Sequence, residues 1–336
     1  MEVSASVALW LDTGARPRLR RPPRPGGASN NVRGVLRRML LGSTGILVAL
    51  LAASGAARAA SPLYGVTIDR IAKISHVAEA LAALPERPTT RVYFEPAERA
   101  SHYAGALAQV HRVSAVMGEL LDSSDEKSTS TEAFQAHVEE YLAALQGSVD
   151  IWEVGNEVNG NWTGAYETVA AKLTEAYRDV ASAGGTTALT LYENSFGPEH
   201  CGDGESELTP VQFTQRWVPA EVADGLDYVL LSYYPSECGG RMPGDAEVRA
   251  ELEALHALYP NAQLGFGEVG LPRAASKKTA GQAGAVMRWA YSLQPGLSYY
   301  VGGYFWWYGW EDALKPRARL AAALGQAFSA ESEALG

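Results

Sequence analysis

Short apolar runs alternate with amphipathic stretches along the chain from Leu63 onward. Eight runs have the length and the β-branched or aromatic content typical of strands. They span residues 63–68, 91–95, 114–118, 150–156, 188–193, 228–233, 263–268 and 298–307. Between them, residues 131–145, 169–183 and 246–258 repeat apolar positions at helical spacing, with Ser, Thr or Asp near their starts.

Eight strand–helix units in about 277 residues match the count and size of a (β/α)₈ barrel, an α/β fold. A doubly wound open sheet is the alternative. It usually carries a glycine-rich phosphate loop after the first strand, but Gly65 is isolated and no GxGxxG follows it. We therefore expect one TIM-barrel domain over residues 60–336.

The first 59 residues do not share this alternation. Residues 1–38 form an arginine- and proline-rich arm that is expected to be disordered and that supplies the basic start of an export signal. Residues 39–59 continue with an apolar run and end in Ala57-Arg58-Ala59, which predicts a secretory signal peptide cut after Ala59. Arg37-Arg38 also resembles a twin-arginine signal. A membrane anchor is the alternative, but the run is shorter than the ~20 residues of a span.

These features predict an exported protein, periplasmic or extracellular, with no stable membrane span in its mature form. Without residues 1–59 the chain keeps 19 basic and 36 acidic residues, a net charge of −17. This charge disfavours nucleic acid and anionic membranes and favours neutral or cationic partners. We expect a monomer that needs no cofactor.

The two cysteines are Cys201 and Cys238, each shortly after a predicted strand. Because an exported protein folds in an oxidising compartment, we expect a disulfide between these neighbouring loops. The six histidines are scattered and form no metal-binding motif, so no metal site is predicted.

Two of the predicted strands end on a glutamate. Ile151-Trp152-Glu153-Val154-Gly155-Asn156-Glu157 is the fourth run, and Leu264-Gly265-Phe266-Gly267-Glu268 is the seventh. In a parallel barrel all carboxyl ends of the strands open onto one face, where the chemistry takes place. Two carboxyl groups at one mouth suit glycoside hydrolysis. The alternative is a pair of solvated glutamates at strand ends. Glu153 shares strand parity with Glu157, and we expect it to be a paired charge in the core and not a catalytic group.

Asn156-Glu157 on the fourth strand and Glu268 on the seventh resemble the clan A glycoside hydrolases, which are retaining (β/α)₈ enzymes. Within that clan, Leu231-Ser232-Tyr233-Tyr234-Pro235, Arg91-Val92 and Gly303-Tyr304-Phe305-Trp306 are similar to the endo-β-1,4-galactanases. The first strand, Tyr64-Gly65-Val66-Thr67-Ile68-Asp69, departs from the galactanase pattern, so the family is not assigned. The resemblance implies that Glu157 is the acid/base and Glu268 the nucleophile.

The same resemblance implies substrate-binding roles for six further residues. Arg91 and a tyrosine would keep Glu268 ionised. Tyr233 and Tyr234 are both candidates, but strand alternation sends only one of them into the mouth. Asn156 would bind the sugar 2-hydroxyl. Trp306 would form the floor of the cleavage subsite, and Trp162 would be a second aromatic platform.

The sequence thus predicts a secreted retaining β-glycosidase that hydrolyses O-glycosidic bonds of a polysaccharide or oligosaccharide by double displacement. One alternative is a non-catalytic carbohydrate-binding barrel. Another is a barrel lyase or aldolase, but Lys277 and Lys278 lie in a polar loop and no Schiff-base lysine or metal cluster is visible at a strand end.

Overall fold

The computed structural model describes residues 62–196, 201 and 208–335 of the 336-residue chain. The predicted basic arm, signal peptide and cleavage site lie outside these residues, as do Ala60, Ser61 and Gly336 at the ends of the predicted domain.

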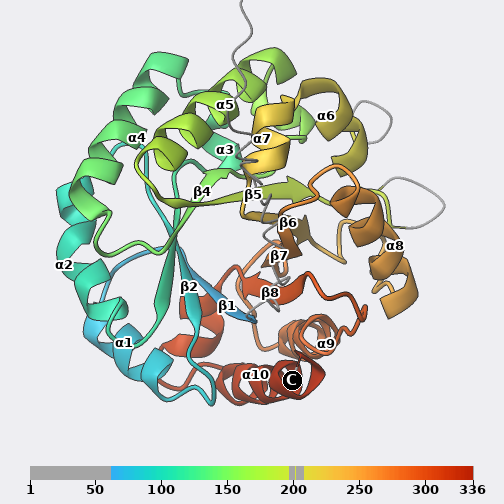
Figure 1. The fold of residues 1–336 in the computed structure, drawn as a ribbon. Helices are drawn as coiled ribbons and strands as arrows, with labels where there is room; N and C mark the ends of the chain where they lie inside the picture. The colour runs from blue at the N-terminus through green and yellow to red at the C-terminus, as the bar shows by residue number, and fades with distance from the viewer. Residues whose placement is uncertain (1–61, 197–200, 202–207, 336) are drawn as a thin grey trace, which may run out of the picture. The chain divides into compact units, whose positions relative to one another are not determined.

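Eight parallel strands close into a barrel in the order in which they occur along the chain (Figure 1). They are β1 (Leu63–Ile68), β2 (Thr89–Tyr93), β3 (Ala115–Glu119), β4 (Ile151–Gly155), β5 (Thr186–Tyr192), β6 (Tyr228–Tyr233), β7 (Gln263–Val269) and β8 (Tyr300–Trp306). Strand β8 pairs with β1 and completes the barrel. The prediction of a (β/α)₈ TIM barrel is confirmed, and β1 and β6 have the bounds expected from the sequence.

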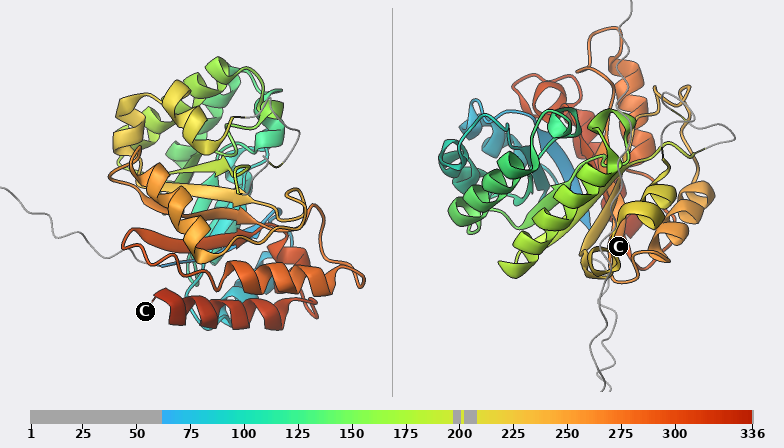
Figure 2. Two further views of the ribbon diagram at one scale, coloured as in Figure 1. Left: turned by 90° about the vertical axis from the view of Figure 1, so that its right-hand side faces the viewer. Right: turned by 90° about the horizontal axis from the view of Figure 1, so that it is seen from above.

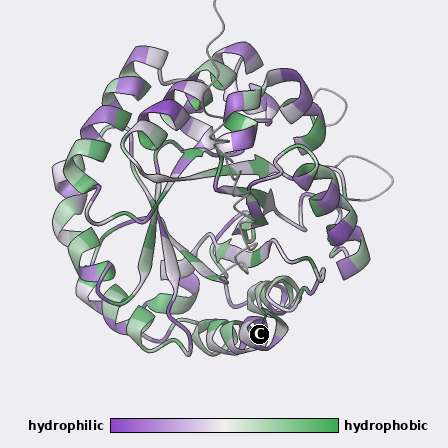
Figure 3. Ribbon diagram, in the orientation of Figure 1, coloured by the Kyte–Doolittle hydropathy of each residue, from purple (hydrophilic) through white to green (hydrophobic). Residues whose placement is uncertain are grey.

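Helices lie in a ring around the strands (Figures 1 and 2). The longer ones are α1 (Ile74–Ala82), α2 (Ala100–Val110), α4 (Thr131–Leu145), α5 (Tyr166–Ser182), α6 (Pro210–Trp217), α8 (Asp245–His256), α9 (Ala280–Ala290) and α10 (Ala321–Leu335). Shorter turns are α3 (Ser123–Glu126), η1 (Asn161–Thr163), α7 (Ala220–Gly225) and η2 (Trp310–Leu314). Hydrophobic and hydrophilic residues alternate along the helices, as amphipathic packing on a barrel requires (Figure 3).

The helix boundaries follow local sequence signals. Ser130 begins α4 by accepting a hydrogen bond from the backbone N–H of Ala133. Thr209 and Gln212 form a reciprocal capping box at the start of α6. Gly184, just past the end of α5, has a φ of 73°, a conformation that glycine adopts without steric cost.

The barrel interior changes from apolar to charged along the strands. Leu63, Met117, Ile151, Ala188, Leu230, Val301 and Phe305 form one buried apolar cluster. Met117 on β3 and Ile151 on β4 belong to this cluster. Two residues further along the same strands, on the same side, the side chains are the acids Glu119 and Glu153. The carboxyl ends of the strands therefore hold the polar part of the barrel.

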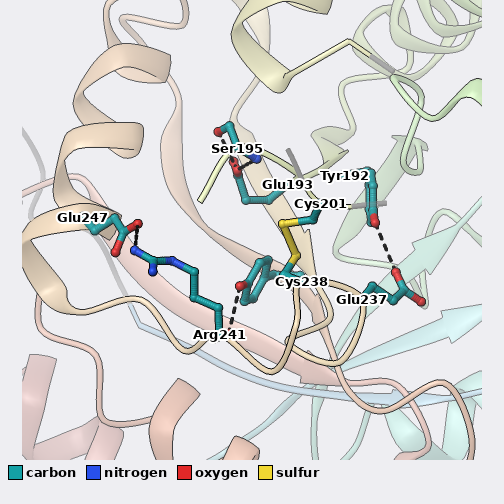
Figure 4. The surroundings of a disulfide bond; sticks show 9 residues. Tyr192, Glu193, Ser195, Cys201, Glu237, Cys238, Arg241 and Glu247 are labelled. Carbon is teal, nitrogen blue, oxygen red and sulfur yellow. Dashed lines mark hydrogen bonds and ion pairs between the residues drawn. A yellow bond between two sulfur atoms is a disulfide. The ribbon is translucent and has the colours of Figure 1, made fainter. Parts of the chain in front are cut away.

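The predicted disulfide is present between Cys201 and Cys238, whose Cα atoms are 4.6 Å apart. It joins the segments that follow β5 and β6 (Figure 4). Glu237, directly before Cys238, accepts a hydrogen bond from the Tyr192 hydroxyl at 3.1 Å. The bridge and this bond together fix the segment after β6 beside the mouth of the barrel. In the described part of the chain, no helix combines the length and apolar content needed to cross a membrane.

Candidate active site

A cavity of about 720 Å³ opens at the carboxyl ends of the strands. Its wall includes Glu157 from the turn after β4, Glu268 from β7, and Tyr234 directly after β6. Trp162 in η1 also lines it. The structure therefore brings four of the residues singled out in the sequence to one concave site, although they are spread over more than 100 positions of the chain.

Glu157 is only 9% exposed, and both of its carboxylate oxygens accept hydrogen bonds from serines. The Ser123 hydroxyl donates to Oε2 at 2.7 Å, and the Ser232 hydroxyl donates to Oε1 at 2.5 Å. Burial raises the pKa of Glu157 to about 7, and these two hydrogen bonds oppose the increase. Repulsion by Asp122 and Glu237 adds to it, so Glu157 keeps its proton to neutral pH.

Glu268 is 5% exposed, and it accepts hydrogen bonds from two donors that are stronger than the serine hydroxyls at Glu157. Arg91 Nη1 donates to its Oε2 at 2.8 Å, and the Tyr234 hydroxyl donates to its Oε1. Burial raises the pKa of Glu268 to about 8, against the lowering effects of Arg91 and Tyr234. Repulsion by the Glu157 carboxylate is among the causes that raise it.

The order of these two pKa values is opposite to the roles assigned from the sequence. The two carboxyl groups lie near each other. The Ser232 hydroxyl donates to Glu157, and the Cα of Ser232 on β6 is paired with that of Glu268 on β7. Such a pair loses its protons in coupled steps. When Glu157 and Glu268 together hold one proton, placing it on Glu157 makes that side chain neutral. The charge repulsion from Glu157 that raises the pKa of Glu268 is then absent. The remaining carboxylate then has a cation and a phenol as donors, whereas Glu157 has two neutral hydroxyls. This proton distribution is the one that an acid and a nucleophile require.

Arg91 is completely buried and connects Glu268 to the interior of the barrel. Its Nε donates to Glu153 Oε2 at 2.6 Å, and its Nη2 lies 2.9 Å from Glu119 Oε1. Glu153 is thus a paired core charge, as expected. Burial raises the pKa of Glu119 well above its usual range. With three carboxyl groups around one guanidinium, Arg91 is held in one position and presents Nη1 to Glu268. It positions the carboxylate and does not line the cavity.

The two adjacent tyrosines at the end of β6 have separate roles. Tyr234 shares strand parity with Ser232 and donates to Glu268. Tyr233 points to the other side, where its hydroxyl donates to the Arg241 carbonyl at 2.9 Å and its ring packs on Trp289. The alternative left open by the sequence is therefore resolved in favour of Tyr234.

Asn156 is 3% exposed and lies next to Glu157. Its Oδ1 accepts the backbone N–H of Ser123 at 3.0 Å, which fixes the orientation of the amide. Its Nδ2 has no hydrogen-bond partner among the described residues. Asn156 does not itself line the cavity, although the next residue, Glu157, does. A buried amide donor without a partner is costly, so an acceptor that reaches it from the cavity would be favoured.

Trp306 does not line the cavity. It is completely buried, and its indole N–H donates to Asp312 Oδ2 at 3.0 Å. Strand β8 is irregular: Tyr304 and Phe305 have positive φ angles of 63° and 31°, and the pairing with β1 and β7 shifts register. The resemblance implied that Trp306 forms the floor of the site, but Trp307 lies on the cavity wall in its place, and it shares strand parity with Phe305 of the apolar cluster inside the barrel. Trp307 also packs against the Arg91 guanidinium, 5.2 Å from the ring centre.

Sequence reasoning missed several residues of the wall. Ser123 and Ser232 were not given a role, nor were Asp122 and Glu237. Asp122-Ser123-Ser124 lies just past β3, after Leu120 and Leu121, and an Asp-Ser-Ser sequence close to a barrel strand end is a signal that could have indicated the site.

A second cavity of about 550 Å³ adjoins the first and shares Trp307 and Tyr308 with it. Its wall includes Tyr93 and the exposed Glu95 at the end of β2. The mouth therefore continues across the aromatic pair toward β1 and β2. Among the described residues, no group of three or more His, Cys, Asp or Glu side chains could hold a metal ion.

No protein-family model matches the sequence, and no curated protein is significantly similar to it. Solved structures do share the fold. A GH10 xylanase from Bispora sp. MEY-1, crystallised with xylobiose, is 14% identical with a TM-score of 0.52, over 78% of this chain and 95% of that one. A glycoside hydrolase family 5 enzyme from Prevotella bryantii B14 is 12% identical with a TM-score of 0.52, over 78% of this chain and 86% of that one.

The endo-1,4-beta-D-mannanase of Thermotoga petrophila RKU-1 is 13% identical with a TM-score of 0.50 and covers 73% of this chain and 88% of its own. At these identities the likeness establishes the barrel fold, and function has to be argued from the site.

Proposed function

We propose that this protein is a clan A glycoside hydrolase that cleaves an oligosaccharide or polysaccharide with retention of anomeric configuration. The observation that carries the proposal is the placement of Glu157 and Glu268 on one cavity with different donors. Glycoside hydrolysis uses two carboxyl groups in this way. The named glycosidases that share the fold are consistent with it.

In the first step the Glu268 carboxylate attacks the anomeric carbon while Glu157 gives its proton to the leaving oxygen. A covalent glycosyl ester on Glu268 results. In the second step Glu157, now ionised, takes a proton from water, and the water oxygen displaces Glu268 from the sugar. Arg91 and Tyr234 orient Glu268 throughout.

The proposal extends to binding and location. Asn156 donates through Nδ2 to the 2-hydroxyl of the sugar. Trp162 and Trp307 provide aromatic surfaces for apolar sugar faces. The protein acts as a monomer after export, and the disulfide agrees with an oxidising compartment.

The test is a panel of β-linked glycans with product analysis, followed by the Glu268→Ala variant on the substrate that is cleaved. The variant should fold normally and lose at least about 10³-fold in kcat, because no other nucleophile replaces Glu268. Added azide should restore part of the turnover and give a glycosyl azide of inverted configuration. A folded variant that keeps more than a few per cent of the activity would show that the nucleophile is another group. Binding without turnover by the unaltered protein would favour the non-catalytic barrel.

A further inference from the structure

All of the charged side chains on the cavity wall are acidic. Asp122, Glu157, Glu237 and Glu268 line it, and no lysine or arginine does among the described residues. The adjoining cavity adds Asp69, Glu95 and Arg70.

Arg70 does not neutralise this surface. It lies 3.3 Å from Asp69 and 3.1 Å from Glu311, so its own charge is already balanced by two carboxylates.

Two of these carboxylates have no part in the proposed mechanism. Asp122 begins α3, where its Oδ1 accepts from the Ser124 N–H at 2.8 Å and the Ser124 hydroxyl at 2.5 Å. Its Oδ2 has no hydrogen-bond partner among the described residues. Glu237 is held by Tyr192 and by the disulfide at the next residue (Figure 4). Both carboxylates are therefore fixed in place before any ligand arrives.

Both also lie beside the acid/base. Ser123, between Asp122 and Ser124, is the residue that donates to Glu157 Oε2. The charges of Asp122 and Glu237 act directly on Glu157, since each of them raises its pKa.

A cleft of one sign with apolar walls concentrates ligands of the opposite charge. A fixed carboxylate binds an ammonium group through a charge-assisted hydrogen bond, and nearby aromatic faces add to the attraction. Trp162, Trp307 and Tyr308 supply such faces on the same wall. A cationic glycan would offset the repulsion among these carboxylates, whereas an anionic glycan would increase it.

We propose that Asp122 and Glu237 select a glycan that carries free amino groups, and that they bind an ammonium on a sugar next to the one that is cleaved. This inference rests on the proposed glycosidase function and adds the substrate class. The position of the ammonium is inferred from the role proposed for Asn156. In that role its Nδ2, which has no partner among the described residues, donates to the 2-substituent of the cleaved sugar, and an ammonium there would offer no acceptor.

The experiment compares three β-linked hexasaccharides. In the first, a hexosamine chain, half of the amines are N-acetylated and half are free; in the second all are N-acetylated; in the third a hydroxyl group replaces every amine. Both the gluco and the galacto series are used. In at least one series kcat/KM for the amine-bearing form should exceed that of both neutral forms by roughly tenfold or more, the ratio expected from one charge-assisted hydrogen bond. Mass spectrometry should find an N-acetylated sugar at the new reducing end, with a free amine on the adjoining sugar of the original chain.

Two variants test the assigned residues. In Asp122→Asn and Glu237→Gln the preference for the amine form should fall several-fold, and added salt should reduce it in the unaltered protein. Glu139→Gln, an exposed glutamate on α4, is the matched control and should keep the preference.

Equal or faster cleavage of the neutral forms in both series would overturn the inference. Activity that depends on Glu268 would then still leave the glycosidase function standing. Variants that keep the full amine preference would also overturn the inference. If no hexasaccharide is cleaved in either series, the inference fails, and the proposed function fails only if the full panel of β-linked glycans is not cleaved either.

Discussion

Removing the Tyr234 hydroxyl should shift the pH range in which the protein is active. This hydroxyl donates to Glu268 Oε1 and lowers the pKa of that carboxyl group. A hydrogen bond to a charged group contributes about 1.5–3 kcal/mol, which corresponds to a pKa change of about 1–2 units. In Tyr234→Phe the pKa of Glu268 should rise by this amount, so the nucleophile becomes protonated at a higher pH.

The assay is the pH dependence of kcat/KM on an aryl glycoside of the accepted sugar with an activated leaving group. Such a substrate needs little help from the acid, so the acidic limb of the profile reports the nucleophile in the free protein. Tyr234→Phe should move this limb upward by about 1–2 units and lower kcat/KM about 10- to 100-fold on its acidic side.

Tyr233→Phe is the matched control. Its hydroxyl donates to the Arg241 carbonyl and has no contact with Glu268, so the acidic limb should stay in place. The reasoning is refuted if the limb of Tyr234→Phe overlays that of the unaltered protein, or if both variants shift it equally.

The disulfide and the buried acids give two further predictions. Unfolding the unreduced protein should expose no free thiol, and reduction of Cys201–Cys238 should cost about 4 kcal/mol in the chain-entropy model; two titratable thiols would reject the bridge. Burial raises the pKa of Glu193 to about 8, so the folded state holds a proton that the unfolded chain releases near pH 4.5. The free energy of unfolding should therefore fall as pH rises from about 4.5 to 8, which thermal unfolding can measure. The fall should be less steep in Glu193→Gln, and it should be as steep as in the unaltered protein in the exposed-site variant Glu139→Gln. A melting temperature that does not depend on pH would contradict this.

The sequence was sufficient for the fold and for the pair of glutamates. Both follow from local pattern: short apolar runs, amphipathic helices, and strand ends that must meet at one face. The disulfide followed from the number of cysteines and their positions after β5 and β6.

Side-chain direction was the part that the sequence could not provide. Alternation left Tyr233 and Tyr234 equivalent until the position of Glu268 was known. On β8, where Tyr304 and Phe305 have positive φ angles, the resemblance pointed to Trp306, but Trp307 is the residue that reaches the cavity. Irregular backbone of this kind depends on packing between strands and leaves little trace in the pattern of hydrophobic residues.

The serine donors to Glu157 were missed for a related reason. Ser123 begins α3, after β3, and Ser232 lies on β6, and only the closed barrel brings them to one carboxyl group. Their spacing along the chain carries no motif. The charge of the cleft likewise emerges only when Asp122 and Glu237 are seen on the same wall as the two proposed catalytic glutamates.

The stereochemistry of the first-formed product tests the central claim most directly. Proton NMR can follow the anomeric signal of a defined β-linked substrate during the first minutes of hydrolysis, before mutarotation. Attack by Glu268 followed by attack of water inverts the anomeric centre twice, so the β-anomer should appear first. Initial formation of the α-anomer would mean that water attacks directly, and the assignment of Glu268 as a covalent nucleophile would be wrong.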